Sequence, residues 1–231
     1  MNQWKFLGEG LRSNHDGSPW VIGVWREVPL DISLCKGLNA SNYIQDALSF
    51  VQGEILAEVE CEGEVIHSEE KSTWERMRVI RAWKWTKRES VSLAVFAARK
   101  ALAEFESKYS GNDRPRKAIE AAEKWLNTES AESASAAEWS AARAAELIWS
   151  AVAAARSAEE ELAARSAAWS ARSAAQSTRG SAWSARAAAW SSVWAAAESA
   201  RSEVQRDIHT YIIEKLIPTM ELIGKMETET D

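Results

Sequence analysis

The sequence contains few residues that cross-link a chain or bind metals. It has two cysteines, four prolines and three histidines among 231 residues. Cys35 and Cys61 have no metal-type spacing, and a single disulfide could not frame a chain of this length. A reduced intracellular setting is therefore the simpler interpretation. No histidine has a second ligand at metal spacing, so we expect no metal site and no cofactor.

Long apolar runs are also missing. The longest apolar windows are alanine stretches interrupted by Arg and Glu, and the first ten residues lack the regions of a signal peptide. The net charge of −6 gives no overall basic field that would attract nucleic acid. We therefore expect a soluble intracellular protein with neither a membrane nor a nucleic acid polymer as its partner.

Catalytic signatures are absent as well. Gly8-Glu9-Gly10 lacks the third glycine and the following helix of a nucleotide-binding fingerprint. Serine is so abundant that spacing cannot single out a Ser-His-Asp set. We assign no catalytic residue and favour a binding protein over an ordinary hydrolase.

Residues 1–88 are predicted to form a small α+β domain. Residues 55–62 alternate between apolar and mostly acidic side chains with the period of two that is typical of a strand. A second run alternates in the same way and would place Met77, Val79, Arg81 and Trp83 on one side. Together the two runs predict a β-hairpin.

The two runs carry complementary charge. Residues 54–70 contain seven glutamates and no Lys or Arg, whereas residues 71–88 contain seven basic residues and one Glu. The first interpretation is structural, with glutamates facing arginines across the ladder. The alternative makes Arg76 and Arg78, with nearby tryptophans, a basic aromatic surface for a phosphate-bearing ligand.

Residues 89–220 are predicted to form a larger all-α bundle, followed by a polar tail at 221–231. Ser90 is placed to cap the first helix, and Asp113 with Pro115 to open the next. Residues 116–217 contain no proline and are dominated by alanine. The fold class is thus α+β, a small N-terminal domain joined to a helical bundle, with helix faces available for homo-oligomer formation.

Tryptophan and arginine recur at a seven-residue interval between Arg165 and Trp194. Trp169, Gln176, Trp183 and Trp190 form one series, and Arg165, Arg172, Arg179 and Arg186 form the other. On a helix both series follow one stripe, beside a stripe of small residues that includes Ser170 and Ser173. The small face predicts backbone-close packing.

The Trp/Arg stripe is open to three interpretations. The indoles could fill gaps between helices, with guanidiniums stacked on neighbouring rings. They could instead line a ligand cleft, with Trp planes stacking a base and Arg groups holding phosphates; its candidate residues are Arg172, Arg186, Trp183, Trp190 and Trp194. The third interpretation is a surface that binds another protein.

Residues 35–81 resemble an uncharacterised domain of bacteriophage and prophage proteins. The shared order is Gly-Leu-Asn-Ala-Ser at 37–41, Asp-Ala-Leu at 46–48, a Gly-Glu turn, Glu-Lys at 70–71 and an Arg-x-Arg strand. Asn39 occupies the position of that family's histidine. The resemblance implies an accessory protein carried by a phage or mobile element and acting in the cytoplasm of a bacterial host cell.

Two further stretches carry resemblances. GNDRPRKAIEAAEKWL at 111–126, followed by alanine-rich helices, is similar to helical immunity proteins found beside bacterial toxins. An Ala-Ser step leading into a helix and then an acidic strand is similar to ADP-ribosyltransferase-like folds. That likeness implies that Ser41 is the step serine and that Glu58 or Glu60 is the acidic group.

These observations lead to one functional hypothesis and two alternatives. The first is a phage-type counter-defence protein that sequesters a small nucleotide-derived immune signal without turnover, with Asn39, Ser41, Arg76 and Arg78 as candidate ligand-binding residues beside those of the stripe. The first alternative is a protein-binding immunity or inhibitor module that blocks a bacterial effector. The second is an enzyme directed at ADP-ribose compounds.

Overall fold

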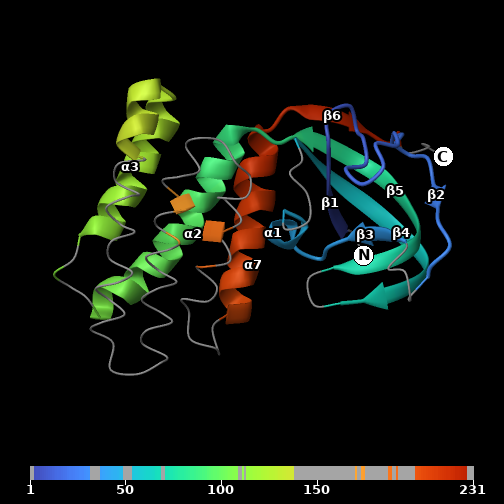
Figure 1. Cartoon of the computed structure of the whole chain (residues 1–231), viewed down its shortest axis with the longest axis horizontal. Coiled ribbons are helices and arrows are strands. Elements are labelled where there is room, and N and C mark those ends of the chain that lie inside the picture. Colours follow the sequence, from blue (N-terminus) through green and yellow to red (C-terminus); the bar gives the residue numbers. More distant parts are fainter. Residues whose placement is uncertain are drawn as a thin grey trace. The chain divides into compact units, whose positions relative to one another are not determined.

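The structure consists of two compact units. This computed structural model describes residues 3–31, 37–48, 54–68, 71–108, 111, 113–137, 170, 173–174, 187–188, 191 and 201–227 (Figure 1). The first unit combines residues 1–85 with residues 217–231, and the second comprises residues 86–216. The two ends of the chain therefore belong to the same unit.

The first unit is built on a six-stranded antiparallel sheet. Its strands are β1 (Gln3–Leu7), β2 (Arg26–Glu27), β3 (Leu38–Ala40), β4 (Ile55–His67), β5 (Ser72–Lys84) and β6 (Leu222–Lys225). One edge of β5 pairs with β4, and the other edge pairs in turn with β3, β2 and β6. The outer edge of β4 pairs with β1. The long hairpin β4–β5 thus organises all the other strands.

A single bridge joins β3 back to β1. The Trp4 and Ser41 backbones exchange two N–H···O hydrogen bonds, each 2.9 Å long. Strands β1, β4, β5 and β3 therefore follow one another in a ring of pairings. One buried cluster draws on all four: Leu7, Trp20, Leu38, Ala40, Ile55, Ala57, Val59, Met77, Val79 and Ala82. A short helix, α1 (Ile44–Ala47), follows β3 and buries Ile44 and Ala47.

The predicted hairpin and its charge pairing are confirmed. Glu58, Glu60 and Glu62 lie opposite Arg81, Arg78 and Arg76, respectively. The closest contacts, Arg81 Nε to Glu58 Oε2 and Arg78 Nη2 to Glu60 Oε2, are both 2.6 Å long.

The expected alternation along the second strand is wrong beyond Val79. The register shifts between Glu58 and Val59, so Glu58 pairs with Arg81 while Val59 pairs with Val79. Ile80 is therefore the extra residue of a β-bulge, which reverses the faces of all residues after it. Ala82 enters the core with Met77 and Val79, and Arg81 joins the arginines on the opposite face.

The predicted fold class, a small N-terminal α+β domain followed by a larger all-α bundle, is wrong. The chain contains a six-stranded sheet whose last strand, β6, comes after the helices. Residues 222–225 lie within the segment expected to be a polar tail, but they pair with Arg81, Ala82 and Trp83 of β5. The helical residues are therefore inserted into the sheet-containing unit rather than appended to a finished domain.

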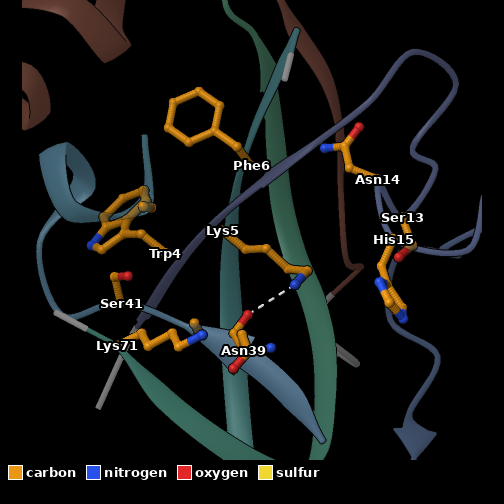
Figure 2. A pocket seen from close by; sticks show the side chains of 11 residues that line it. Trp4, Lys5, Phe6, Ser13, Asn14, His15, Asn39, Ser41 and Lys71 are labelled. Atoms are coloured by element: carbon orange, nitrogen blue, oxygen red, sulfur yellow. Dashed lines mark hydrogen bonds between the residues drawn. The ribbon is translucent and has the colours of Figure 1, made fainter. Parts of the chain in front are cut away.

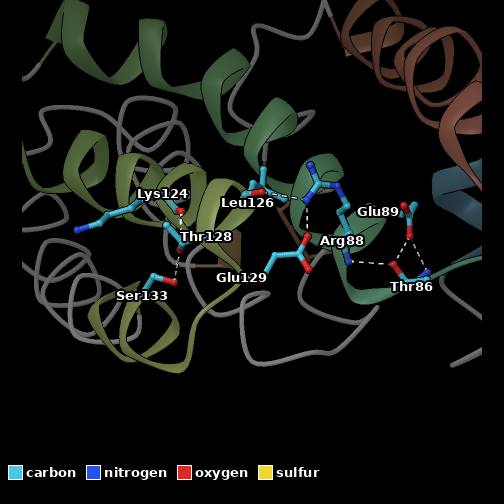
Figure 3. Close-up of polar contacts among 8 residues, drawn as sticks. All are labelled: Thr86, Arg88, Glu89, Lys124, Leu126, Thr128, Glu129 and Ser133. Atoms are coloured by element: carbon cyan, nitrogen blue, oxygen red, sulfur yellow. Dashed lines mark hydrogen bonds and ion pairs between the residues drawn. The ribbon is translucent and has the colours of Figure 1, made fainter.

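The second unit begins with α2 (Lys87–Lys108). Thr86, not Ser90, precedes the first turn: its backbone N–H donates to the Glu89 carboxylate at 2.7 Å, and its hydroxyl donates to the same oxygen (Figure 3). This Thr-x-x-Glu arrangement resembles a capping box and satisfies donors that the first turn would otherwise leave unpaired. Helix α3 (Arg114–Thr128) starts after Asp113 with Pro115 in its first turn, as predicted.

Ion pairs and ring contacts join these helices. Arg99 donates two hydrogen bonds to Glu123, linking α2 to α3. Phe96 of α2 stacks on Tyr211 of α7 (Arg201–Tyr211) with ring centroids 4.0 Å apart. A π-helical turn, η2 (Ile212–Leu216), continues α7, and a 3₁₀ turn, η3 (Ile217–Thr219), follows in the sheet-containing unit.

The alanine- and serine-rich segment is described only at a few helical positions. Ser170, Ser173, Ala174 and Ala188 are buried there, and the Ser170 hydroxyl donates to the Ala188 carbonyl at 2.8 Å. A side-chain hydroxyl can reach a backbone 18 residues away only if the two segments approach closely. At Ser170 the structure thus shows the close backbone approach that the sequence predicts, and most of the small-residue stripe lies outside the described residues.

Candidate functional site

A pocket of about 350 Å³ opens beside β1 in the sheet-containing unit. It is lined by Trp4, Lys5, Phe6, Ser13, Asn14, His15, Asn39, Ala40, Ser41, Ala47 and Lys71 (Figure 2). The lining comes from β1, the loop that follows it, β3, α1 and the β4–β5 turn. The volume lies at the lower end of the range for small-ligand sites.

Lys5 is the central charged group of the pocket. Trp4 and Phe6 occupy one face of β1, so Lys5 points to the other, as Figure 2 shows for Trp4 and Lys5. Its Nζ donates to the Asn39 carbonyl at 2.8 Å. Burial, reinforced by the nearby Arg26 guanidinium, lowers the pKa of Lys5 to about 8. The ammonium group is therefore held where water stabilises it poorly.

A second cation lies close to Lys5. The Lys5 ammonium is 5.6 Å from the centroid of the Trp20 ring, and the Arg26 guanidinium is 4.5 Å from the same centroid. Arg26 donates to the Ser18 hydroxyl, and its buried Nη1 has no hydrogen-bond partner within the described part of the chain. Two cations thus share one buried indole, and the nearby Asp16 carboxylate offsets part of their charge.

A tight turn positions the loop residues of the pocket. The Asp16 carboxylate accepts hydrogen bonds from the Ser18 N–H and hydroxyl, at 3.1 and 2.6 Å. These bonds hold the pKa of Asp16 well below its usual value. The same loop presents Ser13, Asn14 and His15 to the pocket.

Asn14 depends on a glycine for its position. The Asn14 Oδ1 atom lies 2.8 Å from where a side chain on Gly8 would place its Cβ. Any other residue at position 8 would therefore displace the asparagine from the pocket wall.

Two candidate binding residues, Asn39 and Ser41, line this pocket. Asn39 is fixed by the Thr73 hydroxyl, which donates to Asn39 Oδ1 at 2.8 Å, and its carbonyl accepts from Lys5. Ser41 is buried and forms the bridge to Trp4. The structure thus brings these two residues together with Lys5 and Lys71.

The candidate residues Arg76 and Arg78 lie outside the pocket. Arg76 contacts Glu27 and Glu62 at 2.7 and 3.2 Å, and Arg78 contacts Glu60. Both guanidiniums also lie over the Trp25 ring, 4.7 and 4.6 Å from its centroid. Their contacts are those of the structural interpretation, and a ligand-binding role for them stays a prediction.

The candidate residues of the helical stripe, Arg172, Arg186, Trp183, Trp190 and Trp194, lie outside the described residues. Glu58 and Glu60, the candidate acids of the transferase-like interpretation, are not among the pocket-lining residues. Their carboxylates bind Arg81 and Arg78 instead.

Sequence reasoning missed the cations of the pocket, Lys5 and Lys71. A signal for Lys5 was available: in Trp4-Lys5-Phe6-Leu7, an alternating strand places the lysine on the same face as Leu7, which is fully buried. Lys71 offered no such signal, because it lies in the hairpin turn and reaches the pocket only through the pairing of β3 with β5.

Metal-binding clusters and membrane-spanning helices are both absent from the described residues. Within them, no group of three or more His, Cys, Asp or Glu residues could hold a metal ion. No helix in the described ranges is both long and apolar enough to cross a membrane.

Burial raises the pKa of the Cys61 thiol to about 12.

Comparison with protein families, curated proteins and solved structures found no match to this chain.

Proposed function

We propose that this protein binds a small phosphate-bearing, nucleotide-derived ligand in the pocket beside β1 and holds it without turnover. The main observation in support of this proposal is the charge of the residues that line the pocket. Lys5 and Lys71 line the pocket together with His15, and no Asp or Glu is among its eleven lining residues. In a chain of net charge −6, this local excess of cations favours an anionic ligand.

The neutral groups of the pocket support the same proposal. Ser13, Asn14, Asn39 and Ser41 offer hydroxyl and amide groups that donate to and accept from a polar ligand. Ala40 and Ala47 add apolar surface, and Trp4 and Phe6 line the pocket from β1. This mixture of an apolar wall and a few polar groups is typical of small-molecule sites.

Binding without turnover fits the chemistry of these groups. The described lining supplies no carboxylate as general base and no Ser–His hydrogen bond that would activate a hydroxyl. Lys5 donates to a backbone carbonyl and thus acts as a positioned cation.

The biological role follows as part of the proposal. The likeness of residues 35–81 to phage and prophage proteins favours counter-defence, in which the protein removes an immune signal from the cytoplasm of a bacterial host. Stoichiometric capture requires a site that binds tightly and leaves its ligand intact.

One experiment tests this proposal. The purified protein is incubated with an extract of cells in which nucleotide signalling is active, washed, and heat-denatured, and the released compounds are identified by mass spectrometry. We expect an intact phosphate-bearing nucleotide from the wild type and none from Lys5→Met. Release of an altered nucleotide would favour the ADP-ribose-directed enzyme, and an empty wild-type protein would contradict the proposal.

A second candidate function, a protein-binding module that blocks an effector, is favoured by one observation. Val21, Val24, Leu222 and Ile223 are between 41% and 59% exposed, and all belong to the sheet-containing unit. Exposed apolar side chains of this kind often mark protein contacts. Val24→Asp with Leu222→Asp should abolish effector inhibition and leave ligand capture intact if both functions exist.

A further inference from the structure

The pairing of β1 with β3 stops after one bridge. Trp4 and Ser41 exchange both backbone hydrogen bonds, and the next pair along an antiparallel ladder would be Phe6 with Asn39. That pair is not formed. The Asn39 carbonyl instead accepts from Lys5 Nζ at 2.8 Å (Figure 2). The lysine thus takes the acceptor that the Phe6 N–H would use.

The Phe6 backbone consequently faces the pocket. Trp4 directs its N–H and C=O to Ser41, and Gly8 directs its own to Arg12. Because these groups alternate in direction along a strand, those of Phe6, midway between, point to the same side. Phe6 is 1% exposed and lines the pocket, and the pairing with Asn39 that would satisfy its N–H is not formed in the part of the chain that the structure describes. A buried N–H without a partner is rare in proteins.

We propose that the Phe6 backbone determines the ligand specificity of this pocket. It recognises the edge of a planar ring that carries a hydrogen-bond acceptor beside a donor. The Phe6 N–H donates to the acceptor, and the Phe6 carbonyl accepts from the donor. A nucleobase edge and a ring carboxamide share this chemistry. The inference depends on the proposed function, because the phosphate of the same ligand would bind the lysines.

The dimensions of the gap limit the ligand. The unpaired stretch is one residue long, enclosed by the Trp4–Ser41 bridge on one side and the Gly8–Arg12 bridge on the other. A peptide strand pairs through several successive residues, so this opening suits a single planar group. A volume of about 350 Å³ accommodates a compound of about mononucleotide size.

The test combines affinity with exchange of individual backbone amides. Titrations with AMP, nicotinamide mononucleotide, ribose 5-phosphate and inorganic phosphate give the affinities, and NMR hydrogen exchange follows the Phe6 amide at equal saturation. The Trp4 amide, already bonded to Ser41, is the internal control. We expect AMP or nicotinamide mononucleotide to bind at least ten-fold more tightly than ribose 5-phosphate. Whichever binds should slow Phe6 exchange at least ten-fold and leave Trp4 exchange unchanged.

Each contrary outcome has a distinct meaning. Equal affinity for all four compounds, with Phe6 exchange unaffected by AMP and nicotinamide mononucleotide, would overturn this inference and leave the proposed function standing. Protection of the Phe6 amide by inorganic phosphate alone would also overturn it, since an oxyanion would then occupy the N–H. If none of the four compounds binds, the proposed function fails and the inference fails with it. Protection by only one of the two ring compounds supports the inference and identifies the base or the carboxamide as the group that is read.

Discussion

The Nζ atom of Lys5 lies 2.8 Å from the carbonyl oxygen of Asn39, where β1 and β3 cease to pair. One side chain thereby occupies the carbonyl at the end of the β1–β3 pairing and supplies positive charge to the pocket. Burying an ammonium group costs free energy of folding. The effect of Lys5 on the stability of the protein and its effect on ligand binding can therefore be measured separately.

Lys5 should lower the stability of the protein without ligand. Its folded-state pKa, about 8, is below the ordinary value of 10.5, so the unfolded chain holds more protons between these pH values. The free energy of unfolding should therefore rise with pH across this window because of Lys5. At pH 7 we expect Lys5→Met to be more stable than the wild type by roughly 1–3 kcal/mol. The difference should shrink by pH 10, as measured by urea unfolding.

The matched control is Lys225→Met, which removes an exposed lysine from β6 of the same sheet. It should leave both the stability and its pH dependence unchanged. A Lys5→Met variant that is less stable than the wild type at every pH would show that the Asn39 hydrogen bond outweighs the burial of charge.

The hairpin pair Glu60–Arg78 should be energetically coupled. Arg78 Nε donates to Glu60 Oε2 at 2.7 Å, and the two residues are direct cross-strand neighbours. Arg78→Glu places like charges opposite each other and should lower the free energy of unfolding by about 1 kcal/mol. Adding Glu60→Arg should restore at least half of that loss. Denaturant unfolding of the four proteins in this double-mutant cycle measures the coupling, and strictly additive losses would refute it.

This pair also shows what the sequence can predict. The acidic and basic runs are local in sequence, so their alternation and complementary charge were enough to predict the hairpin. The bulge at Ile80 left no signal, because Arg81 and Trp83 fit the uninterrupted alternation equally well. The pocket depends on residues 5, 13–15, 39–41 and 71, which meet through the bridge between Trp4 and Ser41 and the pairing of β3 with β5. No local pattern contains such a contact.

The prediction of the fold class was wrong for a similar reason. Leu222-Ile223-Gly224-Lys225 is too short and too near the end of the chain to be recognised as a strand. It becomes one because β5 still has a free edge at residues 81–83. Residues 222–225 thus form a strand because β5 offers a free edge, and not because of their own sequence.

The first turn of α2 should depend on Thr86 more than on Ser90. The Thr86 hydroxyl donates to the Glu89 carboxylate and accepts from the Arg88 N–H at 3.1 Å (Figure 3). Thr86→Ala should cost about 1 kcal/mol, as measured by thermal unfolding with circular dichroism. Ser90→Ala is the comparison: Ser90 lies inside the helix, where its hydroxyl donates to the Thr86 carbonyl at 3.3 Å, so we expect a smaller effect on the first turn. The reverse order would mean that the helix starts at Ser90 after all.

The buried Ser170 should tolerate no larger side chain. It is fully buried and its hydroxyl donates to the Ala188 carbonyl. Ser170→Ala should cost about 1 kcal/mol through the lost hydrogen bond, and Ser170→Leu should cost roughly 1–3 kcal/mol more through overpacking. Ser191, which is partly buried, provides the control, and Ser191→Ala should be nearly neutral. Equal unfolding midpoints for Ser170→Leu and the wild type would contradict close packing here.

The most direct test of the whole account is calorimetric titration of AMP into three proteins at pH 7: the wild type, Lys5→Met and Lys225→Met. The pocket geometry predicts that Lys5→Met binds at least ten-fold more weakly than the wild type while remaining folded, and that Lys225→Met binds as the wild type does. Equal affinity of Lys5→Met and the wild type for AMP would contradict the assignment of this pocket as an anion-binding site.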